Sequence, residues 1–434
     1  MTKRASLGKA GPVHADTLTY VLLDVALVLV LVRLLAGVLA RLGQPPVMAE
    51  ILAGIALGPS IFGALAPAAS ASLFSVEATQ MLSAIGSLGL VVFMFFVGLE
   101  VDYGTARAHR RTVGWVALGS LLAPLACGVV LGLSLYPAHA TVAGEQVPKV
   151  AFVLFVCVAL AVTAFPVLAR ILHDHGLDGT RLGTIAMSVA AVHDVSGWLL
   201  LALALAAASG DTPLTVLWTA LAVAGLAIGL LKLARPLLRR RLAGADLERG
   251  APAELAVVLV LLLLCAGFTE AIGLHAVIGA FLFGVAFPRD AGTEVVASLR
   301  RALLPLTLAL LLPIYFLGPG LNFDLGTLGA GGLAGIALIV VVSCAATLVG
   351  TAAGASYAGL SRRDAGILGV LLNTRGLVEL IILNIGFTAG VLGQALYSEF
   401  VVMALLTTLL TSPILRLAMR SARGELWQRA LADA

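Results

Sequence analysis

The feature of this sequence that most constrains its fold is a series of long, unbroken apolar runs. One of them, VLLDVALVLVLVRLLAGVLA at 21–40, has no alternation of apolar and polar residues and is long enough, as a helix, to cross a bilayer. Of the 434 residues, 60% are hydrophobic and 12% are charged, whereas a soluble domain has about 25% charged residues. Backbone groups in lipid must bond to one another, which only helices and closed barrels achieve. The sequence therefore predicts an all-α polytopic membrane protein.

The apolar runs predict about thirteen membrane spans. Most of the 27 Lys and Arg residues fall in loops that this count places on one side of the membrane, together with the C-terminus. By the positive-inside rule that side is the cytoplasm, so the N-terminus is expected outside the cell membrane. Tails are expected at 1–17 and, in the cytoplasm, at 419–434. The expected spans are 18–41, 46–66, 80–100, 112–136, 149–172, 180–208, 213–237, 253–269, 272–288, 302–318, 330–358, 364–390 and 397–418.

Two pairs of segments indicate an internal repeat. EILAGIALG at 50–58 is similar to AVIGAFLFG at 276–284, and FFVGLEVD at 95–102 is similar to YFLGPGLNFD at 315–324. The members of each pair are seven spans apart, so the two copies face opposite ways across the membrane. This predicts inverted repeats over about 18–208 and 253–418, joined by a linker helix at about 213–237. Inverted repeats are typical of secondary transporters, whose substrate site lies near the midplane.

Two spans contain signals for a broken helix. In the fifth span, VTAFP places Thr163 three residues before a proline, which removes a backbone donor and disfavours helix just before it. The twelfth span contains Asn373, Thr374 and Arg375, followed by a glycine and then Glu379. Arg375 and Glu379 are four residues apart, so we expect a structural pair. Broken helices present free carbonyls to ions in transporters, and we expect Thr163, Asn373 and Thr374 to face the ion.

The sixth span carries two adjacent ionisable residues, His193 and Asp194, in SVAAVHDVSGWLLLALAL. A carboxylate inside a membrane is expensive and is a candidate functional group. A single carboxylate that binds either a proton or an alkali cation is the least that an antiporter requires. The alternative is that Asp194 is neutral and hydrogen-bonded within the helix bundle. His193 is a second candidate for ion or proton binding, and as a group that titrates near neutral pH it is also a candidate pH sensor. It either orients Asp194 or points to a different neighbour, because adjacent helix residues do not share a face. Glu50 and His275 are expected to have structural roles.

Four segments resemble the monovalent cation:proton antiporter-2 family, and the resemblance extends over roughly residues 18 to 418. It implies a thirteen-helix fold with a dimerisation domain and a core domain, in which the fifth and twelfth spans are discontinuous and cross near the ion site. It also implies homodimers and an elevator-like movement. The segments are QPPVMAEILAGIALGPSIFG (44–63), VTAFPVLARIL (162–172), AVHDVSGW (191–198) and LLNTRGLVELIILNIG (371–386).

Two positions depart from the pattern of that family. Its members usually have Asp-Asp or Asn-Asp, and sometimes Gln-Asp, where this chain has His193 and Asp194, and many have a lysine where this chain has Thr347. With one carboxylate and no fixed ammonium, we predict one-for-one, electroneutral exchange of Na⁺ or K⁺ for H⁺ at Asp194. An organic cation or a cation complex as substrate, a channel-like pathway and a sensor remain alternatives. A membrane enzyme using His193 and Asp194 is disfavoured, and no cofactor or nucleic-acid partner is expected.

Overall fold

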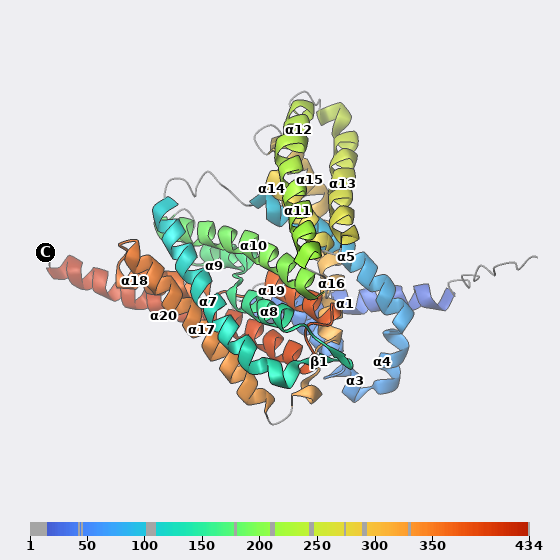
Figure 1. Cartoon of the computed structure of the whole chain (residues 1–434), viewed down its shortest axis with the longest axis horizontal. Helices are drawn as coiled ribbons and strands as arrows, with labels where there is room; N and C mark the ends of the chain where they lie inside the picture. Colours follow the sequence, from blue (N-terminus) through green and yellow to red (C-terminus); the bar gives the residue numbers. More distant parts are fainter. Residues whose placement is uncertain are drawn as a thin grey trace, which may run out of the picture.

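The computed structural model describes residues 15–41, 44, 47–100, 110–177, 180–208, 213–242, 247–272, 275–288, 293–328 and 331–432. Nearly all of this part is helical (Figure 1), and within it the only strands are the short hairpin β1 (Thr141–Val142) and β2 (Glu145–Gln146). The N-terminal residues 1–14 and the end of the FFVGLEVD motif, residues 101–102, lie outside the described residues. The predicted all-α architecture is confirmed.

The helices follow the predicted spans closely. In the first half of the chain they are α1 (Ala15–Arg41), α2 (Val47–Leu57), α3 (Phe62–Leu65), α4 (Pro67–Leu73), α5 (Val76–Glu100), α7 (Arg110–His139), α8 (Lys149–Ala161), α9 (Phe165–Asp174) and α10 (Arg181–Ala208). In the second half they are α11 (Pro213–Gly229), π-helical η1 (Leu230–Ala234), α12 (Arg235–Leu242), α13 (Leu247–Ala271), α14 (Ala276–Ala286), α15 (Thr293–Leu306), π-helical η2 (Thr307–Leu311), α16 (Leu312–Leu321), η3 (Leu325–Thr327), α17 (Gly332–Tyr357), α18 (Arg362–Leu372), α19 (Leu377–Thr388) and α20 (Gln394–Ala432).

Ten helices among the described residues are long and apolar enough to cross a membrane, and three shorter apolar helices accompany them. The shorter ones are Lys149–Ala161, Ala276–Ala286 and Val378–Thr388. The first and last of these belong to the two spans that were predicted to be broken, and both breaks are present, between α8 and α9 and between α18 and α19. The total of thirteen spans and the inverted repeat stay predictions.

Glycines bring the segments of the suspected repeat into close contact. A Cβ atom on Gly320 in α16 would lie 2.1 Å from the carbonyl carbon of Gly54 in α2. A Cβ on Gly284 in α14 would lie 3.0 Å from Cα of Gly98 in α5. Small residues of this kind let helix backbones approach closely in lipid, where close packing drives helix association. The glycines of the two similar sequence segments therefore serve as the helix contacts.

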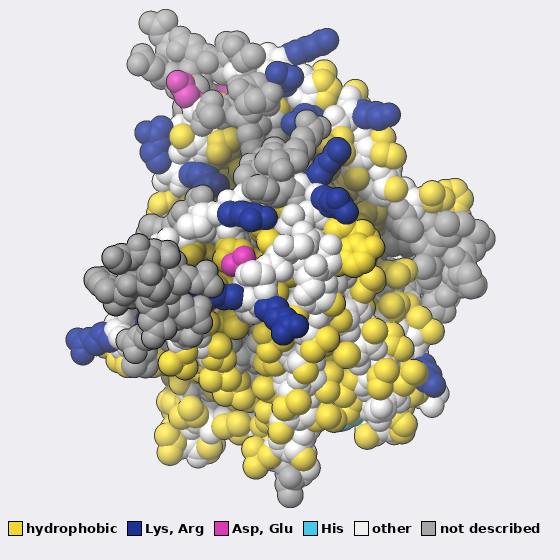
Figure 2. Space-filling model, turned by 90° about the vertical axis from the view of Figure 1, so that its left-hand side faces the viewer, with side chains coloured by type: hydrophobic (Ala, Val, Ile, Leu, Met, Phe, Trp, Pro, Cys, Tyr) yellow, Lys and Arg dark blue, Asp and Glu magenta, His cyan; other side chains and the backbone are white. Residues whose placement is uncertain are grey.

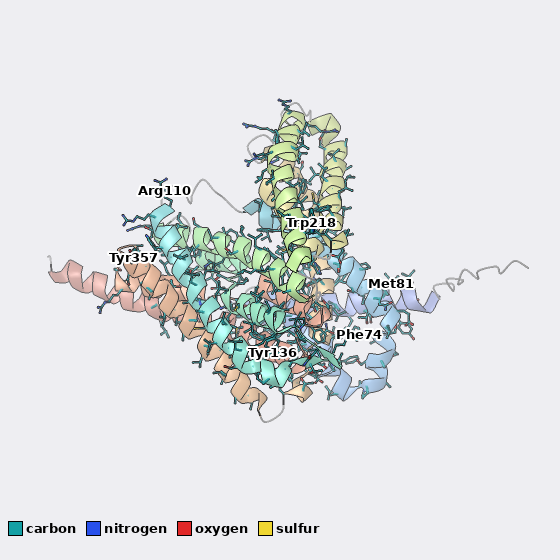
Figure 3. The ribbon with its side chains drawn as sticks, viewed as in Figure 1. Phe74, Met81, Arg110, Tyr136, Trp218 and Tyr357 are labelled. Atoms are coloured by element: carbon teal, nitrogen blue, oxygen red, sulfur yellow. The ribbon has the colours of Figure 1, made fainter. Side chains whose placement is uncertain are left out.

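A second close helix pair, α7 and α17, runs diagonally across the molecule in Figure 1. A Cβ on Gly119 would lie 2.3 Å from the carbonyl oxygen of Gly350. Figure 3 shows Arg110 at one end of α7 and Tyr136 near the other. Tyr357, at the end of α17, packs its ring 4.3 Å from that of Trp115, and such aromatic residues are typical of membrane interfaces.

The surface also has the distribution expected of a membrane protein. Figure 2 shows Lys and Arg side chains gathered above a broad apolar area on one face. Many large apolar side chains are exposed, among them Val130 on α7 at 67% and Val349 on α17 at 66%. Lipid covers such side chains without cost, whereas water would not.

Candidate functional site

The two helix breaks lie directly against each other. The backbone N–H of Ala164, between α8 and α9, donates to the carbonyl of Thr374, between α18 and α19, over 3.0 Å. The Thr163 hydroxyl donates to the carbonyl of Leu372 over 2.8 Å. Backbone groups freed by a helix break must find partners when no water reaches them. Each break therefore satisfies part of the other, and the two broken spans form one crossing.

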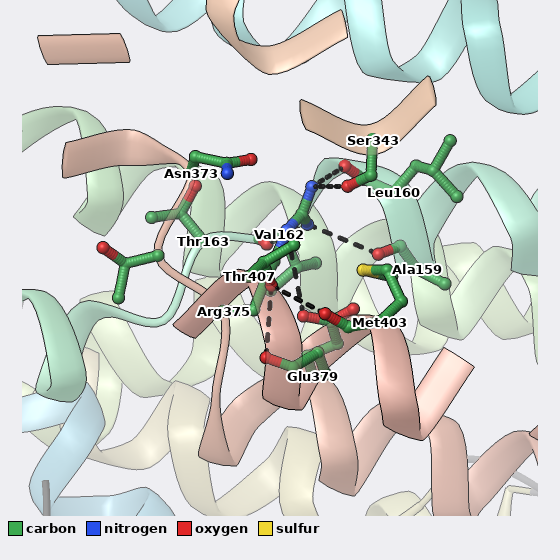
Figure 4. Close-up of polar contacts among 12 residues, drawn as sticks. Ala159, Leu160, Val162, Thr163, Ser343, Asn373, Arg375, Glu379, Met403 and Thr407 are labelled. Carbon is green, nitrogen blue, oxygen red and sulfur yellow. Dashed lines mark hydrogen bonds and ion pairs between the residues drawn. The ribbon is translucent and has the colours of Figure 1, made fainter. Parts of the chain in front are cut away.

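Arg375 fills the centre of this crossing and is 1% exposed. Figure 4 shows its guanidinium reaching the end of α8. There it donates from Nη1 to the carbonyls of Ala159, at 3.3 Å, and Val162, and from Nη2 to the carbonyl of Leu160. The last carbonyls of a helix have no helical partner and form its negative end. The fixed charge of Arg375 therefore neutralises the broken end of α8.

The same guanidinium contacts two hydroxyls of α17. Arg375 Nη2 lies 2.8 Å from Ser343 Oγ and 3.5 Å from Thr347 Oγ1. The guanidinium therefore brings a fixed positive charge next to Thr347, from a different span. Glu379 is a looser partner, with 3.9 Å between Arg375 Nε and Glu379 Oε2, and its two carboxyl oxygens make no hydrogen bond within the described residues. The Thr408 hydroxyl in α20 donates to the carbonyl of Arg375 over 2.6 Å.

His193 links α10 to the crossing and to α7. Its Nδ1 lies 3.0 Å from Thr163 Oγ1, and its Nε2 lies 3.0 Å from Ser120 Oγ. The Thr163 hydroxyl donates to the carbonyl of Leu372, and the Ser120 hydroxyl donates to the carbonyl of Val116 over 2.6 Å. Each hydroxyl oxygen is therefore placed to accept from the ring nitrogen that it faces, and the contacts do not single out one neutral tautomer. Both ring nitrogens are thus occupied by hydroxyls, and the ring holds three helical segments together.

Asp194 is the next residue along α10 and is 1% exposed. One turn later on the same face, Trp198 is buried, and its ring lies 6.2 Å from that of Phe281 in α14. The indole N–H of Trp198 makes no hydrogen bond within the described residues. An aromatic pair therefore joins α10 to α14 one turn from Asp194.

The remaining candidate residues differ in whether their polar atoms have hydrogen-bond partners. The Asn373 amide donates to Cys344 Sγ at 3.3 Å, while its Oδ1 accepts no hydrogen bond within the described residues. The Thr374 hydroxyl is buried and donates to the carbonyl of Leu371 over 2.6 Å. Glu50 is buried in the first turn of α2, and its Oε2 is without a partner among the described residues.

Sequence reasoning missed several members of this cluster. Ser120 carries no local signal, because serine is an ordinary residue of membrane helices, and Trp198 appeared only as the last residue of AVHDVSGW, with no role assigned to it. Ser343 could have been found, since it lies four residues before Thr347 and therefore on the same face of α17. His275 has the structural place expected of it, as the N-cap of α14, where Nδ1 accepts from the N–H of Val277 at 3.5 Å.

Comparison with known proteins identifies relatives along nearly the whole chain. Residues 26–420 match the family model described as sodium/hydrogen exchanger, transmembrane. The chain is 38% identical over 424 residues to Cation/H(+) antiporter 18 of Arabidopsis thaliana, covering 94% of this chain and 51% of the relative. It is 35% identical over 404 residues to Na(+)/H(+) antiporter NhaS4 of Synechocystis, covering 92% and 97%. It is 32% identical over 421 residues to K(+)/H(+) antiporter 1 of Saccharomyces cerevisiae, covering 95% and 48%. The chain thus spans about half the length of the plant and yeast relatives.

The fold is similar to that of a solved antiporter. The sodium proton antiporter MjNhaP1 of Methanocaldococcus jannaschii matches with a TM-score of 0.67, over 93% of this chain and 99% of that one, at 18% sequence identity. This likeness confirms the predicted polytopic antiporter fold. The sequence relatives confirm the resemblance to monovalent cation:proton antiporters, which are transporters and not enzymes. The chain belongs to the family of transmembrane sodium/hydrogen exchangers.

Proposed function

We propose that this chain exchanges Na⁺ or K⁺ for H⁺ across the membrane, and that Asp194 binds either ion in turn. The observation that carries the proposal is the burial of this carboxyl group, 1% exposed, beside a histidine that is bonded to the helix crossing. A carboxylate held away from water is costly unless a proton or a cation neutralises it. Competition between the two ions for one carboxylate couples their movements in opposite directions.

The charge balance at the crossing supports one-for-one, electroneutral exchange. Arg375 occupies the carbonyls at the end of α8, so these oxygens do not serve the transported cation. A guanidinium does not release its proton in proteins, so Arg375 supplies a constant positive charge, where a lysine could also carry a proton. In this proposal Asp194 is the single group that changes its charge during the cycle.

Oxygen atoms near the crossing supply further ligands for an alkali cation. Asn373 Oδ1 accepts no hydrogen bond within the described residues, and Thr163 Oγ1 retains a lone pair beside His193. The hydroxyl of Thr374 is committed to its own helix. His193, with both ring nitrogens occupied, positions the neighbouring Asp194 and does not ligate the cation. Oxygen ligands suit hard cations, and they do not by themselves separate Na⁺ from K⁺.

The remaining parts of the proposal depend on family likeness and on the distribution of arginines. We infer that the crossing moves as a unit in an elevator-type cycle and that the chain assembles as a homodimer. We also infer a plasma-membrane location with the C-terminus in the cytoplasm, because Arg110, Arg181 and Arg362 begin helices α7, α10 and α18.

The test uses the purified chain in liposomes that contain a pH-sensitive dye. A preformed proton gradient is challenged with Na⁺, with K⁺ and then with larger organic cations. We expect an alkali cation to dissipate the gradient with the native chain and with the control Asp364→Asn, which removes a carboxylate in the first turn of α18. Asp194→Asn is expected to abolish the effect. If only organic cations dissipate the proton gradient, the substrate is an organic cation and not Na⁺ or K⁺. Cation flux without proton movement would indicate a channel.

A further inference from the structure

A polar pocket lies along the first half of α5, whereas Arg110 begins the next helix, α7, beyond the other end of α5. Its volume is about 220 Å³, which is room for about seven water molecules, or for a small cation with part of its hydration shell. Helix α5 begins at this pocket, and α16 and α19 end there. Its polar lining residues are Thr79, Ser83 and Ser87 of α5, Asn322 after α16, and Asn384 and Thr388 of α19.

Several of these polar groups lack a protein partner. Thr79, Ser83 and Ser87 follow one another at intervals of four residues, so they share one face of α5. Their hydroxyls make no hydrogen bond within the described residues. In lipid-exposed helices a serine usually bonds to a carbonyl of its own helix. A row of three unbonded hydroxyls therefore points to water or to a ligand in the pocket.

The walls of the pocket carry two further features. Asn322 Nδ2 donates to Asn384 Oδ1 at 3.3 Å, which joins the end of α16 to the half-helix α19. Tyr315 also lines the pocket, and its hydroxyl is buried. The pocket is thus bounded on one side by α5 and α16 and on the other by a helix of the crossing.

The helix ends around the pocket favour a cation. Helices α16 and α19 both direct their negative C-terminal ends toward it, and neither has a basic residue in its last turn. The positive N-terminal ends nearby are compensated by carboxylates. Glu270 Oε2 accepts from the backbone N–H of Ala276 at the start of α14 over 2.8 Å, and Glu77 lies in the first turn of α5. The helix ends and carboxylates around the pocket therefore give it a net negative potential.

Helix α14 connects the pocket to the candidate ion site. His275 lines the pocket at the start of α14, and Phe281 is six residues further, about 9 Å along the helix axis. Phe281 lies against Trp198, which is one turn beyond Asp194 on α10. The aromatic pair therefore joins α14, which begins at the pocket, to α10 one turn from Asp194.

We propose that this pocket is a second binding site for the transported monovalent cation. It holds the cation, partly hydrated, before the cation passes Trp198 and Phe281 to reach Asp194. The ligands are the hydroxyl oxygens of Ser83 and Ser87, together with amide oxygen from Asn322 or Asn384. Uncharged oxygens suit a monovalent cation, whereas tight binding of a divalent ion requires carboxylates. This site rests on the proposed function, because it supplies the cation that Asp194 exchanges.

The test compares transport from the two faces of the membrane. Right-side-out and everted vesicles of a bacterial host without antiporters of its own would each be supplied with Na⁺ or K⁺, and KM measured on each face. We expect the double variant Ser83→Ala, Ser87→Ala to raise KM about three- to tenfold on the pocket face, as expected for the loss of one or two weak ligands. KM and maximal rate on the arginine-bearing face should not change, which also shows that the variant is folded.

Two controls accompany the double variant. Ser134→Ala removes an exposed hydroxyl that donates to the carbonyl of Val130, away from the pocket, and is expected to leave both KM values unchanged. Ser87→Thr keeps a hydroxyl and should retain the native KM. An unchanged KM on the pocket face, or an equal change on both faces, would overturn the second site. Absence of exchange by the native chain would instead contradict the proposed function.

Discussion

Replacing Arg375 with lysine keeps the positive charge at the crossing but removes part of the guanidinium fork. The guanidinium reaches five acceptors through Nη1 and Nη2, which are three carbonyls of α8 and the hydroxyls of Ser343 and Thr347. An ammonium group has three donors, so at least two acceptors lose their partner. The longest contacts, to Ala159 at 3.3 Å and to Thr347 at 3.5 Å, are the ones we expect to be lost.

The magnitude follows from the number of partners left unsatisfied. Each lost hydrogen bond in a buried place costs about 1 kcal/mol, so Arg375→Lys should lower the free energy of unfolding by about 2 kcal/mol. Arg375→Met leaves all three carbonyls of α8 without this donor, at about 1 to 3 kcal/mol each. It also leaves the buried Glu379 without its charged neighbour. We therefore expect Arg375→Met to yield little folded protein.

The assay is thermal unfolding of the purified chain in detergent, combined with the liposome exchange measurement. The expected order of stability is native, then Arg375→Lys, then Arg375→Met, with exchange retained in the lysine variant. The control Arg362→Met removes an exposed arginine from the start of α18 and should behave as the native chain. Equal stability of the lysine and methionine variants would refute the role assigned to the guanidinium.

Three further changes test other parts of the structure. Ser120→Ala removes the hydroxyl partner of His193 Nε2. It should lower the free energy of unfolding by about 1 kcal/mol and slow cation exchange in liposomes. Native exchange rates would contradict the positioning role of His193. Gly320→Ala would place a Cβ 2.1 Å from the carbonyl carbon of Gly54 and should abolish the monodisperse peak in gel filtration, while a native yield would show that the contact is loose. Asp24→Leu removes a buried carboxyl group whose two oxygens have no hydrogen-bond partner within the described residues. The free energy of unfolding should therefore increase by about 1 to 3 kcal/mol, seen as a higher melting temperature. A lower melting temperature would show that Asp24 binds a partner of its own.

The sequence predicted the helices well because their limits are set by local chemistry. Apolar runs of membrane-spanning length predicted span 330–358, and the structure has α17 at Gly332–Tyr357. The helix breaks were predictable for the same reason, since Pro166 and Gly376 are local signals. The π-helical turns at Leu230–Ala234 and Thr307–Leu311 were not predicted, because nothing in those residues distinguishes them from ordinary helix.

The partners of the site residues were less predictable, because they come from distant parts of the chain. The expected pair of Arg375 and Glu379 is present, at 3.9 Å, but the hydrogen bonds of Arg375 to carbonyls more than 200 residues earlier were not predicted. Spacing along one helix predicts neighbours on that helix only. The contact between Arg375 and Thr347 could not be predicted without knowing how α17 and α18 pack.

The most direct test of the central claim is to count the protons that the purified chain releases when it binds a cation. The protein would be held in a weakly buffered detergent solution with a pH dye, and Na⁺ or K⁺ would be added to saturation. We predict release of close to one proton per chain at a pH where Asp194 is protonated, and none from Asp194→Asn. Release that persists in Asp194→Asn, or cation binding by the native chain without any release, would contradict it.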